Sequence, residues 1–157
     1  FPGALYHVIS RGNYRKDLFT VGKTGEPFEK AIFEACESCC WKLHAYVIMS
    51  NHYHLAIETP KGNLVEGMRW LQGTFGNRFN KFTRERGHAF QGRYKPLLVE
   101  PVRSLLGLVN YIHLNPVRAK LIPVDLLKYF SLSSCPKFFK RSVKLPLVRK
   151  DFAMAHD

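Results

Sequence analysis

Met49-Ser50-Asn51-His52-Tyr53-His54-Leu55-Ala56-Ile57-Glu58 is the stretch from which the fold of this chain can be worked out. It alternates like a β-strand and carries two histidines on either side of one bulky residue. Because successive side chains of a strand point to opposite faces, His52 and His54 share one face, with Cα atoms about 7 Å apart. Two imidazoles at that distance can bind one metal ion, although the same spacing also arises by chance in an ordinary strand.

A second strand is predicted directly before this one. Residues 43–49 are apolar on both faces, which is typical of a strand in the middle of a sheet. Ser50-Asn51 leaves room only for a tight turn, so the two strands form a hairpin. The two histidines therefore belong to the interior of a sheet.

The rest of the chain supplies two more strands and three helices. Residues 6–11 alternate like a strand, and residues 25–40 have helical spacing. Residues 90–99 are predicted to form a strand, and Pro96 favours a place at the edge of the sheet. Strand, helix, hairpin, helix, strand and helix in this order predict an α+β fold. The plan is that of a ferredoxin-like split βαβ sandwich, with helices packed on an antiparallel sheet.

The longest predicted helix covers residues 63–86. Asn63 can cap its start, and Glu66 three residues later would complete a capping box. Apolar side chains recur along this helix at spacings of three and four, which predicts one face packed on the core. The members of this stripe are Leu64, Met68, Leu71, Phe75, Phe79 and Phe82.

A last helix is predicted from Pro101 to Asn115, and Pro116 should end or kink it. Tyr111 and Asn115 are four residues apart, so they project from one side of this helix, apart from its apolar stripe. Two polar groups there could share a task with the histidines. Tyr111 could equally be a core tyrosine, and Asn115, which precedes a proline, could cap a new turn.

The charge of the chain points to its partner. The 157 residues are enough for one domain with a short appendage, and 24 Lys and Arg against 12 Asp and Glu give a net charge of +12. Such a charge favours a polyanion, most often nucleic acid. A membrane surface is the competing partner, but no run of about 18 apolar residues is present. Beyond residues 1–121 the periodicity weakens, so residues 122–157 are predicted to be a basic C-terminal extension.

The cysteines and the first residue give weaker information. Cys36, Cys39 and Cys40 precede His44, a pattern that hints at zinc, but no second pair completes a four-ligand set at metal-binding spacing. Free cysteines are often buried as small apolar residues, so we expect reduced thiols in a cytoplasmic protein. The chain begins at Phe1, so we expect a trimmed sequence, and no secretory signal is visible.

Several stretches together resemble the REP-associated tyrosine transposases. These belong to the single-tyrosine HUH transposases (transposase 17-like), where HUH stands for His, a bulky hydrophobic residue, and His. The matching stretches follow the family's order and spacing over about residues 1–121. They are residues 1–8 with Ser10-Arg11-Gly12-Asn13, residues 46–55, residues 91–95 and residues 111–118.

The resemblance implies a DNA transposase that nicks and joins single-stranded hairpin DNA of repetitive palindromic elements in bacteria. It implies His52 and His54 as metal ligands, Asn115 as a third ligand and Tyr111 as the nucleophile. The metal would be Mg²⁺ or Mn²⁺, although other divalent ions also bind imidazole in vitro. Tyr53, between the histidines, should point into the other face of the sheet.

This chemistry suits these residue types. A neutral tyrosine hydroxyl is a poor nucleophile, so attack on a phosphodiester needs charge relief at the phosphate, which a divalent ion supplies. Attack by Tyr111 would give a 5′-phosphotyrosine and a free 3′-hydroxyl, and the retained ester would let the same site rejoin strands without ATP. Glu58 shares the face of the histidines but lies about 13 Å beyond His54, so we expect a structural role for it.

An alternative function is a catalytically silent, domesticated regulator that only binds single-stranded nucleic acid. In either case we expect a cytoplasmic, nucleoid-associated protein, with monomer and homodimer both open. Basic side chains would hold the DNA backbone, and aromatic ones would stack on unpaired bases. The predicted DNA contacts are Arg11, Asn13, Arg15, Lys16, Arg78, Lys81, Arg93 and Lys95.

Overall fold

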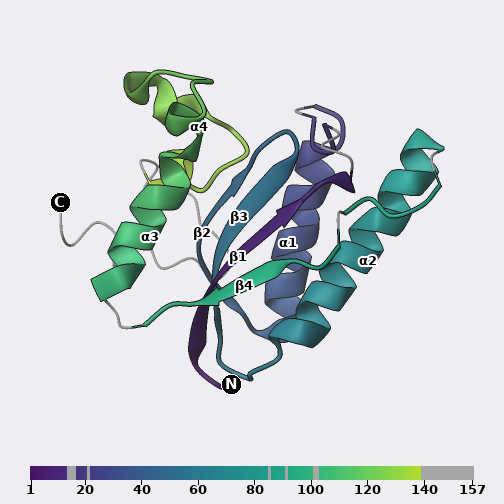
Figure 1. Ribbon diagram of the computed structural model, residues 1–157, viewed down its shortest axis with the longest axis horizontal. Coiled ribbons are helices and arrows are strands. Elements are labelled where there is room, and N and C mark those ends of the chain that lie inside the picture. Colours follow the sequence, from purple (N-terminus) through teal and green to yellow (C-terminus); the bar gives the residue numbers. More distant parts are fainter. Residues whose placement is uncertain (14–16, 21, 85, 91, 101–102, 139–157) are drawn as a thin grey trace.

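The computed structural model describes residues 1–13, 17–20, 22–84, 86–90, 92–100 and 103–138 (Figure 1). None of the helices in this described part has the length and apolar character needed to cross a membrane. In chain order the elements are β1 (Ala4–Arg11), α1 (Gly25–Cys39), β2 (Lys42–Ile48), β3 (His52–Thr59), α2 (Leu64–Thr83), β4 (Lys95–Leu98), α3 (Arg103–His113), α4 (Asn115–Arg118), the 3-10 helix η2 (Val124–Tyr129) and α5 (Cys135–Phe138).

The four strands form one antiparallel sheet in the order β2-β3-β1-β4. Helices α1 and α2 cover one face, and α3 covers the other (Figure 1). The predicted α+β sandwich is confirmed, and so is the interior position of the histidine strand, because β3 pairs with both β2 and β1. Pro96 lies in β4, which is an edge strand of the described sheet and has β1 as its neighbour. A proline, which has no N–H to donate, is tolerated in an edge strand.

Two apolar cores lie on the two faces of the sheet. The larger one joins α1 and α2 to the sheet, with Phe28 of α1 packed against both Tyr53 of β3 and Phe75 of α2. The smaller one places Val109 and Ile112 of α3 against β2 and β3. Tyr53 is fully buried in the first core, so it points away from the face that holds His52 and His54, as predicted. The strand alternation thus separates a packing face from a face with polar groups.

The start and end of α2 differ from the prediction. Asn63 makes no capping hydrogen bond, because its side chain accepts from Trp41 Nε1 at 3.0 Å and donates to the Cys39 carbonyl at 3.0 Å. The predicted capping role was wrong: tertiary contacts to the end of α1 use the same polar atoms. Phe82 was also wrongly assigned to the core, since it is 67% exposed and the helix ends one residue later.

Two further elements are shorter than predicted. Strand β4 begins at Lys95 instead of residue 90, and Phe90 makes only an isolated bridge to Gly12. The last helix is divided at Leu114 into α3 and α4, which is the kink predicted from Pro116. The predicted start at Pro101 lies outside the described residues. The division at Leu114 matters because Tyr111 and Asn115 fall on opposite sides of it.

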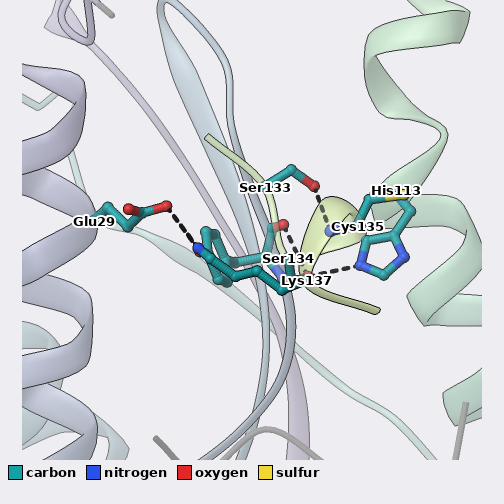
Figure 2. Close-up of polar contacts among 7 residues, drawn as sticks. Glu29, His113, Ser133, Ser134, Cys135 and Lys137 are labelled. Atoms are coloured by element: carbon teal, nitrogen blue, oxygen red, sulfur yellow. Dashed lines mark hydrogen bonds and ion pairs between the residues drawn. The ribbon is translucent and has the colours of Figure 1, made fainter. Parts of the chain in front are cut away.

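Residues 132–138 run along the outer edge of β2. Ser133 bridges to Val47, and Ile48 N–H donates to the Leu132 carbonyl at 2.8 Å. Ser134 Oγ lies 2.6 Å from Nε2 of His113, and the Lys137 ammonium pairs with Glu29 at 3.1 Å (Figure 2). This segment therefore links the end of α3, the sheet edge and α1. The predicted boundary at residue 121 between domain and extension stays a prediction.

Candidate active site

The site is built on the face of the sheet that α3 covers only in part. His54 is buried and His52 is half-buried, and their ring centroids are 5.3 Å apart. Nδ1 of His52 lies 2.7 Å from Oδ1 of Asn51, the turn residue before β3. The hairpin therefore supplies both histidines and a hydrogen-bond partner for one of them.

The α3–α4 break brings the second half of the predicted site to these histidines. The Asn115 amide donates to His54 Nε2 at 3.2 Å. The Tyr111 ring centroid lies 6.0 Å from that of His54. Leu114 is the N-cap of α4 and Asn115 is its first helical residue, so Asn115 does not cap the turn. Tyr111 is 44% exposed and is therefore not a core tyrosine.

Two residues of this cluster were not predicted. Nε2 of His7 lies 2.9 Å from Nδ1 of His54, and the His7 ring stacks on His54 with centroids 5.2 Å apart. Arg118 places its guanidinium 3.8 Å from the Tyr111 ring centroid and donates to the Tyr111 carbonyl. The strand parity of His7 was visible in the sequence, but which strand pairs with β3, and in which register, was not.

Burial keeps the imidazoles neutral. It lowers the pKa of His7, and it lowers the pKa of His52, with the charge of Arg11 adding to the effect. The pKa of His54 falls to about 3, mainly through burial and then through the neighbouring His52, His7, Arg118 and Arg11. At neutral pH these rings carry lone pairs, which is the form that binds metal ions.

Comparison with known proteins identifies the family. The model of the IS200-like transposases matches residues 2–115, which contain every residue of the cluster except Arg118. The chain belongs to the IS200-like transposase family. No curated protein sequence matches it.

Solved structures show the same fold. A REP-associated tyrosine transposase bound to a REP hairpin superposes with a TM-score of 0.74 at 17% identity, over 94% of this chain and 85% of that one. A candidate transposase from Deinococcus radiodurans R1 gives a TM-score of 0.53 at 18% identity, over 71% of this chain and 90% of that one. At these identities the likeness concerns the fold alone.

The donor set of this IS200-like transposase fits a divalent ion. His54 Nε2 and the Asn115 carboxamide are in contact, and a turn of that amide would present its oxygen to the ion. Among the described residues no group of three or more His, Cys, Asp or Glu side chains is arranged to hold a metal. The predicted set has only two such residues, because its third member is an amide. Two imidazoles and one amide oxygen leave positions open for phosphate and water.

The cysteine cluster of the IS200-like transposase does not gather around His44. Cys36 is buried in the larger core, where burial raises the pKa of its thiol to about 12, while Cys40 is exposed. His44 lies on the site face of the sheet, with Nε2 3.0 Å from Oε2 of Glu58. Glu58 also pairs with Lys42 at 3.3 Å. Its contacts therefore lie at the far end of β3 from His52.

The predicted DNA contacts occupy different surfaces of the transposase. Arg11 pairs in register with His52, and Lys95 pairs with Ile9 on the face that carries His54. Four others lie on the α2 side or at its margin. Asn13 donates to the His88 carbonyl, Arg78 pairs with Glu34 at 3.4 Å, Lys81 is exposed on α2, and Arg93 lines a groove; Arg15 and Lys16 lie outside the described residues.

That groove runs between α2 and residues 87–90 and 92–96 in two adjoining hollows of about 440 and about 240 Å³. Arg69, Arg93 and Tyr94 line the first hollow, and Asn77 and Gly73 line the second. The wall of the second hollow is joined to the end of β1, because Asn13 N–H donates to the Ala89 carbonyl and Phe90 bridges to Gly12. It thus reaches the edge of the sheet face that carries His52 and His54. Cations, amides and an aromatic ring along one groove are the groups that bind single-stranded nucleic acid.

Proposed function

We propose that this IS200-like transposase nicks and rejoins single-stranded hairpin DNA through a covalent bond to Tyr111. One observation carries the proposal. Four polar residues from two separate parts of the chain, His52 and His54 on β3 and Tyr111 and Asn115 around the α3–α4 break, meet on one face of the sheet. A protein that only binds DNA has no need of this convergence.

In the proposed reaction the Tyr111 hydroxyl oxygen attacks the scissile phosphorus. A phosphorus–oxygen bond forms, the bond to the 3′ oxygen breaks, and the 3′ oxygen leaves as a hydroxyl while the phenolic proton is given up. The 5′ end remains as a phosphotyrosine ester. Attack by a 3′-hydroxyl on this ester reverses the step, so strands are joined without an external energy source.

The residues around Tyr111 suit charge development at the phosphate. Arg118 lies against the Tyr111 ring, and Arg11 stands at the end of β1 beside His52. Both are permanent cations that can stabilise phosphate oxygens in the transition state. His52, His54 and Asn115 would hold Mg²⁺ or Mn²⁺, which would polarise the phosphate when bound.

The groove along α2 is proposed to receive the DNA. It carries Arg69 and Arg93 and leads past residues 88–90 to the end of β1, where Arg11 and His52 lie. A single strand in the groove would thus continue onto the active face. The solved relative that binds a REP hairpin makes a hairpin of repetitive palindromic DNA the first substrate to test. Chromosomal DNA as substrate would place the enzyme in the cytoplasm, at the nucleoid.

The first test is formation of the covalent adduct. The protein is incubated with a labelled hairpin oligonucleotide and Mn²⁺, and the product is separated under denaturing conditions. We expect an adduct that Tyr111→Phe abolishes, because the nucleophilic oxygen is lost. Tyr129→Phe is the matched control, since Tyr129 is 70% exposed on η2 and outside the cluster. Hairpin binding without any adduct across a library of hairpins would leave only the regulator function.

A further inference from the structure

Each histidine of the His52–Tyr53–His54 motif is held at its Nδ1 atom by a different neighbour. His52 Nδ1 lies 2.7 Å from the carboxamide oxygen of Asn51, and His54 Nδ1 lies 2.9 Å from Nε2 of His7. Asn51 belongs to the hairpin turn, whereas His7 comes from β1, the neighbouring strand. The predicted site residues include neither Asn51 nor His7.

These contacts determine where each proton sits. A neutral imidazole has one N–H, and the nitrogen opposite to it carries the lone pair. The Asn51 oxygen can only accept, so the proton of His52 is on Nδ1. The Asn115 amide donates to His54 Nε2, so the proton of His54 is also on Nδ1 and is donated to His7. Both rings therefore keep the lone pair on Nε2.

We propose that Asn51 and His7 are positioning residues that lock His52 and His54 in the tautomer with Nε2 open to the reaction centre. The inference rests on the proposed function for the use of these lone pairs, but not for the tautomers themselves. The partner of one ring nitrogen sets the tautomer and orientation of a metal-binding histidine. The lock is built into the fold, because the register that pairs Ile9 with His54 puts His7 diagonally across from His54.

The first measurement uses the metal-free protein, so that it does not depend on catalysis. Nitrogen-15 NMR of the histidine rings reports which nitrogen carries the proton. We expect His52 and His54 to carry it on Nδ1. In Asn51→Ala the His52 signal should change to the other tautomer or to a mixture, and in His7→Phe the same should happen to His54. Asn51→Gln and His7→Gln keep a neutral acceptor and should restore the wild-type pattern.

The second measurement is Mn²⁺ affinity by calorimetry without DNA. Loss of either orienting partner should weaken binding about 10- to 100-fold, with recovery in the acceptor-retaining variants. His113, which bonds Ser134 away from the cluster, is the internal reference for an intact fold, and its ring signals should not move.

Two results overturn the inference. The first is an Nε2-protonated His52 or His54 in the metal-free wild-type protein, which needs no variant at all. The second is an unchanged tautomer and unchanged Mn²⁺ affinity in both Asn51→Ala and His7→Phe. A wild-type protein that shows the expected tautomers and Mn²⁺ affinity but forms no adduct with DNA would refute the proposed function and support the lock.

Discussion

Arg118 makes two contacts with Tyr111. Its guanidinium lies over the face of the ring, and it donates a hydrogen bond to the backbone carbonyl. Its charge beside the nucleophile should favour a developing phenolate and the phosphate oxygens. We expect Arg118→Gln to slow adduct formation about 10- to 100-fold, as loss of a transition-state contact does. Single-turnover rates with saturating hairpin and Mn²⁺ measure this effect apart from DNA affinity.

The control for this prediction is Arg118→Lys. It keeps the positive charge but loses the planar group that stacks on Tyr111, so its rate should lie between those of the wild type and Arg118→Gln. A wild-type rate in Arg118→Gln would mean that the cation serves only to hold the α3–α4 break.

At the level of single residues, the sequence predicted which side chains meet but not what surrounds them. Strand parity placed His52 with His54, and helical spacing placed Tyr111 near Asn115, although these two lie on either side of a break. His7 and Arg118 were missed for a physical reason. Their contacts depend on the pairing of β1 with β3 and on the turn at Leu114, and both are set by tertiary packing.

Among the elements, the end of α3 is tied to the sheet edge through a buried histidine. His113 Nε2 lies 2.6 Å from Ser134 Oγ (Figure 2), and this hydroxyl oxygen also accepts from Tyr46 N–H. Burial lowers the pKa of His113 to about 4. Below pH 6.5 the unfolded chain binds a proton at this histidine that the folded protein does not bind. The free energy of unfolding should therefore decrease as the pH is lowered from about 6.5 to about 4.

From these values, lowering the pH from 7 to 5 should reduce the free energy of unfolding by about 2 kcal/mol through His113. His113→Gln removes the titrating group, so its stability should fall less over the same interval, as measured by urea unfolding. His54, with a pKa of about 3, titrates in the same direction in both proteins and cancels in the comparison. Equal pH dependence in the two proteins would contradict the burial of a neutral His113.

Gly73 keeps the groove along α2 open, because glycine has no side chain to occupy it. A Cβ atom added at Gly73 would have no neighbour within 4 Å, so a larger side chain fits without a clash and fills the groove. We expect Gly73→Gln to stabilise the protein by about 0.5–1 kcal/mol through helix propensity. We also expect it to weaken hairpin binding about tenfold, measured by fluorescence anisotropy without metal.

The opposite signs of these two effects make the test specific, because a damaged fold would lower both quantities. Ser38→Gln introduces the same side chain at an exposed position on α1, outside the groove, and should leave hairpin affinity unchanged. Tighter or equal binding by Gly73→Gln would show that DNA does not enter this groove.

At the scale of the whole molecule, the sequence predicted the sandwich because each strand carries its own face pattern. Residues 43–49 are apolar on both sides, and the strand found there, β2, lies between the two cores. The side chains of β3 alternate between the larger core and the face that carries the histidines. The tail was harder to predict. The sequence of residues 132–138 shows no strand or helix periodicity. Backbone pairing to β2 and single side-chain contacts hold this segment, and neither leaves a repeating pattern in a sequence.

The folded unit should therefore extend past residue 121, to at least residue 138. Leu127 and Leu132 are buried, and Phe130 and Phe138 pack against the smaller core beneath α3. A protein ending at residue 138 keeps all of these contacts, so its urea midpoint and adduct formation should match those of the full chain. Ending at residue 121 exposes the edge of β2 and removes two buried leucines, each contributing about 1.5–3 kcal/mol. We expect that protein to be destabilised by at least about 3 kcal/mol, and equal midpoints for the two truncations would show that the extension is not part of the fold.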